Sequence, residues 1–346
     1  MGRENKTEIL TRKSISKFII GIFVVCTILA IVPTKFIAGT QKAYVPQDKN
    51  GPQGFKGIRG LYTPCYYNDS INISDKNNEI EFSIIHITDT QYSSCDEKWS
   101  NLTSWIVSIQ SSYNVKMVVH TGDIVDLWNN STQWKNANAS MYVLADANIP
   151  YTWCLGNHDH NGSNPTQTLA GDYTSFRAST FSSKEWWLSN YGDANTAVHF
   201  MVNGHKFIVV NVEYCANNTV LSWMNEVIKA NTDTNIIVAT HSYLNSTGGY
   251  GWLNSTWEDN FKAMLDDHPN VVITLSGHDI SGTAYNKSVN GRQEIFFNRQ
   301  CKDARCARIM TFNLTQKNVV VKTYLTYSCK WLEDVGNSFS FNFNLI

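Results

Sequence analysis

Residues 149–159 read IPYTWCLGNHD, an apolar run that stops at a glycine and continues into three polar residues. Aromatic and β-branched residues in a short apolar run favour a buried β-strand. Glycine lets the backbone turn sharply after such a strand, so the side chains that follow can face a common centre. Asn157, His158 and Asp159 offer an amide oxygen, an imidazole and a carboxylate, which are groups that bind divalent cations. The stretch predicts a strand with metal-binding chemistry at its carboxyl end.

Four further apolar runs end in the same way. They cover residues 80–88, 115–120, 235–240 and 271–276, and the residues after them include Asp89, Gln91, Asp123, Asp126, His241 and His278. Open α/β sheets hold their sites at the carboxyl ends of strands, so we expect these side chains to meet. Taken singly, Asp89 could cap a helix, Asp123 could stand in a turn and His241 could be a core histidine. Their joint order along the strand ends favours one shared metal site.

Strands and helices alternate through most of the chain. Helical periodicity marks residues 97–109, 131–147, 218–230 and 256–266. Asn203-Gly204 predicts a hairpin between strands at 196–202 and 205–213, and three more strands are expected at 294–298, 307–314 and 319–327. Alternation followed by a run of strands predicts an α/β fold with two packed mixed β-sheets flanked by helices.

The N-terminal residues have a different composition. The basic residues Arg3, Lys6, Arg12, Lys13 and Lys17 precede an apolar segment. This segment is about 20 residues long, enough to span a bilayer. The basic residues before it favour an orientation in which the N-terminal residues stay in the cytosol. We expect a cytosolic tail at 1–17, a transmembrane signal anchor at 18–40, an irregular stalk at 41–78 and the functional domain at 79–346. The chain would then be a single-pass type II membrane protein with an extracellular or lumenal domain. A cleaved signal peptide, which would give a secreted protein, stays open.

Two other features agree with export. Asn-x-Ser/Thr sequons, typical of N-glycoproteins, occur at Asn68, Asn72, Asn101, Asn129, Asn130, Asn138, Asn161, Asn217, Asn245, Asn254, Asn286 and Asn313. Outside the apolar runs, an even set of cysteines suited to disulfide bonds remains, namely Cys65, Cys95, Cys215, Cys301, Cys306 and Cys329.

The charge balance excludes one class of partner. With 28 basic and 29 acidic residues the net charge is -1, so the basic footprint of a nucleic-acid-binding protein is missing.

The motifs carry a family resemblance. The series Asp89-x-Gln91, Gly122-Asp123-x-x-Asp126, Gly156-Asn157-His158-Asp159, Thr240-His241 and Gly277-His278 resembles the motif order of calcineurin-like metallophosphoesterases. The likeness extends over residues 80–314, and residues 220–244 also resemble bacterial members that begin with Asp-Thr-Gln. It implies two divalent ions, of zinc, iron or manganese. Asp123 would bridge them, Asp89 and Gln91 would bind the first ion, and Asn157, His241 and His278 would bind the second.

The resemblance also implies a reaction. A water activated by the two metal ions would attack the phosphorus of a phosphoester, and His158 would aid the leaving group. Asp159 would orient His158, and Asp126 would either contact the metal ligands from outside their shell or serve as a structural hydrogen-bond acceptor. The expected substrate is a phosphorylated small molecule or a lipid or glycan phosphoester, met outside the cytosol. The motifs do not distinguish monoesters from diesters.

Two positions depart from the family pattern. Gln91 stands where many members have a histidine, and Ile280 stands where the last motif, Gly-His-x-His, has its second histidine. Isoleucine cannot coordinate a metal ion, so the first ion is expected to be held less well than the second. This leaves an alternative function, a pseudo-phosphoesterase that serves as a glycosylated surface-binding module. Leu127 stands where purple acid phosphatases have a ligand tyrosine, so a purple enzyme is not expected.

Overall fold

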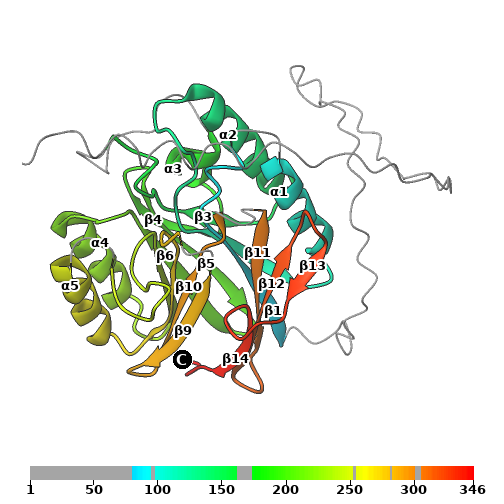
Figure 1. Ribbon diagram of the computed structural model, residues 1–346. Coiled ribbons are helices and arrows are strands. Elements are labelled where there is room, and N and C mark those ends of the chain that lie inside the picture. Colours follow the sequence, from blue (N-terminus) through cyan, green and yellow to red (C-terminus); the bar gives the residue numbers. More distant parts are fainter. Residues whose placement is uncertain (1–79, 95–97, 162–173, 252–254, 281–282, 301–304) are drawn as a thin grey trace, which may run out of the picture. The chain divides into compact units, whose positions relative to one another are not determined.

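The computed structural model describes residues 80–346 apart from 95–97, 162–173, 252–254, 281–282 and 301–304. Within these residues, two seven-stranded β-sheets pack against each other, with helices on their outer faces (Figure 1). All of the described residues belong to one structural unit.

The first sheet is built around three parallel strands. β1 (Glu81–Ile87) pairs in parallel with β2 (Val115–His120), which pairs in parallel with β3 (Tyr151–Trp153). On its other side β1 pairs with an antiparallel group that comprises β11 (Cys306–Asn313), β12 (Asn318–Leu325), β13 (Lys330–Leu332) and β14 (Ser338–Asn342). The carboxyl ends of the three parallel strands therefore share one edge.

The second sheet has four parallel strands at its centre. These are, in spatial order, β6 (His205–Val212), β7 (Asn235–Thr240), β8 (Val271–Ser276) and β10 (Arg292–Phe297). Antiparallel strands complete the sheet, namely β4 (Trp187–Tyr191) and β5 (Asn195–Val202) beside β6, and β9 (Ala284–Val289) beside β10. The chain again brings several strand ends to one edge.

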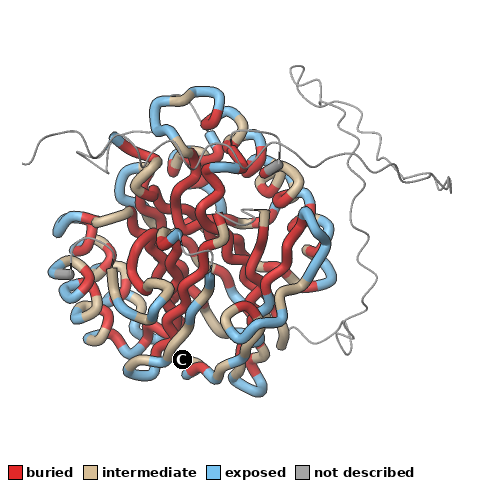
Figure 2. Tube along the Cα trace, viewed as in Figure 1, coloured by how far each residue is buried: buried red, intermediate tan, exposed pale blue. Residues whose placement is uncertain are grey.

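An apolar core separates the sheets. The ring of Phe82 on β1 lies 5.1 Å from Phe207 on β6 and 5.5 Å from Phe200 on β5, in edge-to-face geometry. Burying each such side chain contributes roughly 2 kcal/mol. Figure 2 shows the strands as the buried part of the molecule and the connecting loops as its exposed part.

Strand β6 is apolar on both faces because each face covers a different layer. Phe207 and Val209 belong to the core between the sheets, whereas Ile208, Val210 and Val212 belong to a second core. This alternation follows from the two-residue period of a strand. The second core is completed by α4 (Asn218–Lys229) and α5 (Ser255–Asp266), which lie on the outer face of the second sheet.

The other helices cover the first sheet. α1 (Lys98–Ile109) and α2 (Ser131–Asp146) lie side by side, and Trp105 of α1 stacks on Tyr324 of β12 at 4.6 Å. A short 3-10 turn, η1 (Thr174–Phe176), and α3 (Ala178–Phe181) add two aromatic rings beside Trp153 of β3. Asparagine side chains cap α2 and α4, because Asn130 and Asn217 each accept hydrogen bonds from two backbone amides of the first turn.

The predicted α/β fold with two mixed sheets and flanking helices is confirmed. The tail, signal anchor and stalk predicted at 1–17, 18–40 and 41–78 lie outside the described residues. Among the described helices, none has both the length and the apolar composition needed to cross a bilayer. The expectation that Cys215 forms a disulfide bond is wrong, because Cys215 is a half-buried free thiol beside Tyr214; Cys329 is disulfide-bonded.

Candidate metal centre

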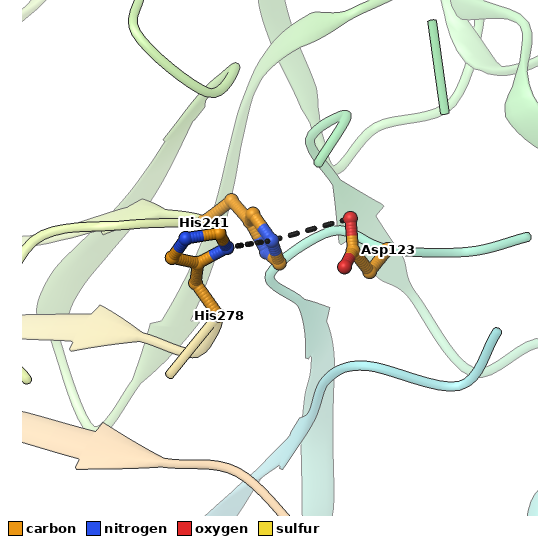
Figure 3. A group of neighbouring side chains, drawn as sticks. All are labelled: Asp123, His241 and His278. Carbon is orange, nitrogen blue, oxygen red and sulfur yellow. Dashed lines mark hydrogen bonds and ion pairs between the residues drawn. The ribbon is translucent and has the colours of Figure 1, made fainter. Parts of the chain in front are cut away.

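Four ligand atoms converge where the strand ends of the two sheets meet. The Nε2 atom of His241 lies 3.2 Å from Oδ1 of Asp123 and 3.0 Å from Oδ1 of Asn157. The Nδ1 atom of His278 lies 3.1 Å from the same nitrogen, and Figure 3 shows the His241 ring between Asp123 and His278. Atoms that bind one ion tetrahedrally at about 2.0–2.1 Å are about 3.3 Å apart. The three distances from Nε2 of His241 therefore match those within a ligand shell.

The orientation of His241 shows that this set fits a cation. Its Nδ1 atom lies 2.8 Å from the carbonyl oxygen of Thr121, which accepts the ring N–H and leaves a lone pair on Nε2 of the neutral ring. That lone pair faces two acceptor oxygens, an arrangement that needs a proton or a cation among them. Burial lowers the pKa of His241, but the carboxylates of Asp123 and Asp89 raise it, to about 9 overall. A carboxylate, an amide and two imidazoles suit zinc, iron or manganese.

Asp123 lies between two groups of potential ligands. Its Oδ1 faces His241 and also accepts the backbone N–H of His158 at 3.0 Å. Its Oδ2 accepts a hydrogen bond from Nε2 of Gln91 at 3.0 Å. The two oxygens of one carboxylate therefore face different side chains, which would allow Asp123 to bridge two ions.

Asp89 supplies a second buried carboxylate. Its Oδ2 accepts the hydroxyl of Thr88 at 2.6 Å and the backbone N–H of His278 at 3.2 Å. Its Oδ1 is buried and has no hydrogen-bond partner among the described residues. Burial raises the pKa of Asp89 to about 7, although the positive charge of His241 lowers this pKa in part. A buried carboxylate oxygen without a partner is costly, and a metal ion would satisfy it.

The backbone is bent to bring these side chains together. Asp89, Asp123 and His278 have φ angles of 52°, 54° and 74°, in the left-handed region that residues other than glycine rarely adopt. Such strain persists only where the surrounding structure enforces it, and it concentrates at functional sites. Gly156 and Gly277 leave no room for a side chain, because a Cβ there would overlap Asp123 and Asp89, respectively.

His158 lies at the open side of the centre and its side chain is 35% exposed. Its Nδ1 atom lies 2.9 Å from the carbonyl oxygen of Asp126 and 3.4 Å from Oδ1 of the same residue. Nε2 faces Oδ2 of Asp123 from 4.0 Å. Burial lowers the pKa of His158, yet the charge of Asp123 and the contacts to Asp126 raise it above its usual value overall.

The Asp159 carboxylate forms its hydrogen bonds with backbone groups and not with the His158 ring, contrary to the expectation that it would orient this residue. Its carboxylate accepts the backbone N–H of Gly156 at 2.7 Å and of Val125 at 2.9 Å. Adjacent side chains in a tight turn point in different directions, so Asp159 holds the two motif loops together while Asp126 contacts His158. Burial, together with the charge of Asp123, raises the pKa of Asp159 to about 7.

The last motif turns away from the centre after His278. Asp279 N–H donates to the carbonyl of Gly277 at 3.0 Å, so the backbone is a tight turn and not extended. The Asp279 carboxylate accepts the backbone N–H of Ser246 at 2.9 Å, and Ile280 is 54% exposed. Neither side chain therefore takes over the ligand role of the family's second histidine.

Two residues at strand ends escaped the sequence reasoning. Gln300 follows β10 and accepts a hydrogen bond from the side chain of Gln91. Tyr214 follows β6, and its half-buried ring lies 5.4 Å from the ring of His278 and 5.9 Å from that of His241. Both follow parallel strands, as the predicted ligands do. The rule that open α/β sheets hold their sites at the carboxyl ends of parallel strands, the strand-end rule, would therefore have found them once the pairing of β6 and β10 was known.

Comparison with known proteins identifies the family. A family model described as calcineurin-like phosphoesterase matches residues 82–281, more than half of the 346 residues. The uncharacterized protein YvnB of Bacillus subtilis (strain 168) is 34% identical over 202 residues, which are 57% of this chain and 15% of that protein. The chain thus spans a small part of that relative's length.

Solved structures agree in fold. A dimetal phosphatase from Danio rerio matches with a TM-score of 0.52 and 14% identity, over 76% of this chain and 99% of the other. Purple acid phosphatase PPD1 from yellow lupin matches with a TM-score of 0.52 and 11% identity, over 76% of this chain and 54% of the other. GAP50 of Plasmodium, described as the anchor in the inner membrane complex, matches with a TM-score of 0.50 and 14% identity, over 77% and 89%. Together with the family match, these observations show that the chain belongs to the calcineurin-like phosphoesterase family.

Proposed function

We propose that this protein is a metal-dependent phosphoester hydrolase with a two-ion centre. One observation carries the proposal: the two oxygens of Asp123 face different side chains, and the side chains on both sides are of types that bind metal ions. Asn157, His241 and His278 lie on the side of Oδ1, and Gln91 lies on the side of Oδ2. The unpartnered Oδ1 of Asp89 supplies a further ligand for the first ion.

The bound ions would activate a water for attack on phosphorus and would offset the charge of the phosphoryl oxygens. The chain itself positions the other participants. Asp126 holds Nδ1 of His158, so that Nε2 faces the space beside Asp123. From there His158 would donate a proton to the departing oxygen. The ring of Tyr214 forms a wall beside His241 and His278 and limits how the substrate can lie.

The loops of the centre also expose apolar side chains, which bears on the substrate class. Tyr92 follows Gln91, Leu127 and Trp128 follow Asp126, and all three are exposed. Exposed apolar groups beside a site favour ligands with apolar parts. Among small-molecule, lipid and glycan phosphoesters, we therefore propose esters that carry an apolar group, such as lipid headgroup esters.

We further propose that the domain acts outside the cytosol, held by the apolar segment at residues 18–40. The basic residues before this segment, the apolar run itself and the many sequons support this location. Protease protection on sealed vesicles tests it, because an extracellular or lumenal domain is digested only from its own side of the membrane. Digestion of the domain from the cytosolic side would contradict the proposal.

Metal content and hydrolysis, measured on the same purified sample, test the catalytic function. Mass spectrometry should find about two ions per chain, and p-nitrophenyl phosphate and bis-p-nitrophenyl phosphate should be compared as substrates. His158→Ala should lower kcat by about 10²- to 10⁴-fold and leave the metal content unchanged, because His158 acts on the leaving group. Asp123→Ala should lose both activity and ions.

His205→Ala is the matched control, because His205 begins β6 at the end remote from the centre. It should behave as wild type. A protein that binds fewer than two ions and hydrolyses neither ester after manganese, zinc or iron is supplied would be a surface-binding pseudo-phosphoesterase instead.

A further inference from the structure

Gln300 reaches the metal centre from a strand that carries none of the recognised motifs. It follows β10, which pairs in parallel with β8, the strand that ends before His278. Its backbone N–H donates to Oδ1 of Asn298 at 2.8 Å, and Asn298 is fully buried. The turn after β10 is thereby fixed, and Gln300 itself is buried.

The side-chain oxygen of Gln300 converges with Asp123 on one point. Nε2 of Gln91 donates to Oε1 of Gln300 and also to Oδ2 of Asp123, at 3.0 Å for the latter. One amide group therefore lies where oxygens from opposite sheets meet. Rotating the Gln91 amide by half a turn exchanges its NH₂ group and its oxygen. Three oxygens would then face one point, an arrangement that a cation at that point would stabilise.

This arrangement accounts for the departure at Ile280. Ile280 points to solvent and offers no ligand, whereas Gln300 offers an oxygen beside Gln91 from the neighbouring strand. We propose that Gln300 is a ligand of the first ion and takes the place of the missing histidine. The first site is then made of oxygens alone, from Asp89, Gln91, Asp123 and Gln300. The inference rests on the proposed two-ion function and specifies one of its two sites.

The two sites then differ in chemistry. The second site contains two imidazoles, which favour borderline ions such as Zn²⁺. The first site contains carboxylate and amide oxygens, which suit a hard ion such as Mn²⁺. A protein given one equivalent of Zn²⁺ and an excess of Mn²⁺ should therefore bind one of each, with zinc in the second site.

The test measures metal content and the electron paramagnetic resonance of bound Mn²⁺ in the wild type and three variants. The wild type should hold one zinc and one magnetically isolated manganese. Gln300→Ala should keep the zinc and bind manganese at least about 10-fold more weakly, because one protein ligand is lost. Gln300→His offers an imidazole in place of the amide, and should bind a second Zn²⁺ more tightly than the wild type does.

Gln293→Ala is the control for loss of a buried glutamine, because Gln293 lies in β10, the strand that Gln300 follows. Gln293 bonds Oδ1 of Asn286 at 3.0 Å, and its variant should bind both metals as the wild type does. If Gln300→Ala holds manganese with wild-type affinity, Gln300 is not a ligand, although the two-ion function stands. If the wild type itself binds fewer than two ions, the proposed function fails first. Gln300→His also keeps the inference testable should Gln300→Ala fold poorly.

Discussion

Gly156 and Asp123 approach each other so closely that a methyl group on Gly156 would overlap both Oδ1 and the backbone nitrogen of Asp123. This contact joins the turn after β3 to the turn after β2. It explains why the residue before Asn157 has no side chain, and it makes the position of the Asp123 carboxylate depend on a residue that offers no ligand.

Gly156→Ala should therefore lose both metal ions. The added methyl group has to displace Asp123, and overpacking of this kind also destabilises a fold by about 1–3 kcal/mol. Metal content and thermal unfolding measure the two effects. In the control, Gly249→Ala, the nearest atom to the new methyl is the side-chain amide nitrogen of Asn245 at 3.1 Å, so a shift of a few tenths of an ångström is enough and no candidate ligand is displaced. Retention of both ions in Gly156→Ala would contradict the steric argument.

Alanine substitutions of Asp126 and Asp159 should affect different properties, activity in the first case and stability in the second. Asp126→Ala removes one contact to the His158 ring, so kcat should fall several-fold while the unfolding temperature stays close to that of the wild type. Asp159→Ala leaves two buried backbone N–H groups without their acceptor, at a cost of about 1–3 kcal/mol each. Its unfolding temperature should fall steeply. Equal losses of stability in both variants would show that the two carboxylates are not distinct in role.

Glu213 should make the stability of the metal-free protein depend on pH. Glu213 is fully buried, and burial raises the pKa of its carboxyl from 4.5 to about 7, although the side chain of Asn195 lowers this pKa in part. Below pH 4.5 the carboxyl is protonated in both the folded and the unfolded chain. As pH rises towards 7, the unfolded chain ionises more readily, so the wild type loses stability, by no more than about 3 kcal/mol.

Glu213→Gln cannot ionise and should not show this loss. The difference in unfolding temperature between Glu213→Gln and the wild type, measured in a chelator, should therefore grow from pH 5 to pH 8. Parallel curves over this range would mean that Glu213 is no harder to ionise in the folded protein than in the unfolded one.

The sequons of the described domain should differ in glycan occupancy if the domain passes through a glycosylating compartment. Asn217 is exposed at the start of α4. Asn245 uses both ends of its amide inside a loop, since Nδ2 donates to Gly251 O at 3.2 Å and Oδ1 accepts Gly249 N–H at 2.9 Å. Glycopeptide mapping should find Asn217 occupied and Asn245 bare.

Thr219→Ala is the clean variant for this test. It removes the sequon of Asn217 but keeps the Asn217 side chain that caps α4. A glycan lost in Thr219→Ala without a change in unfolding temperature would assign the modification to Asn217. A wholly unglycosylated domain from its native cells would contradict the proposed location.

The fold could be predicted where the sequence pattern and the burial coincide. β2, β7 and β8 have the bounds that their apolar runs predicted, because each of them is almost wholly buried. β9 was missed because its sequence, AYNKSV, is polar and only partly buried, and it becomes a strand by pairing with β10. The short β13 and β14 were missed for the same reason, since they exist as partners of β12.

The candidate site could be predicted in part. The strand-end rule marked Asp123, His241 and His278, which the structure brings together. It did not mark Gln300, because the parallel pairing of β10 with β8 joins segments that no local pattern connects. Asp159 follows His158 in the chain and was expected to orient it, whereas in space Asp126 contacts the ring. Side-chain direction within a turn depends on backbone angles that residue types alone do not reveal.

The parallel strands of both sheets end at one edge, so a ligand can change its place in the sequence and still keep its place in space. A lineage that loses a metal-binding side chain after one strand can recruit another from the strand beside it. Scoring such proteins by their linear motifs would then count a relocated ligand as a lost one. Families built on this architecture should accordingly contain active members among the sequences that motif searches set aside as degenerate.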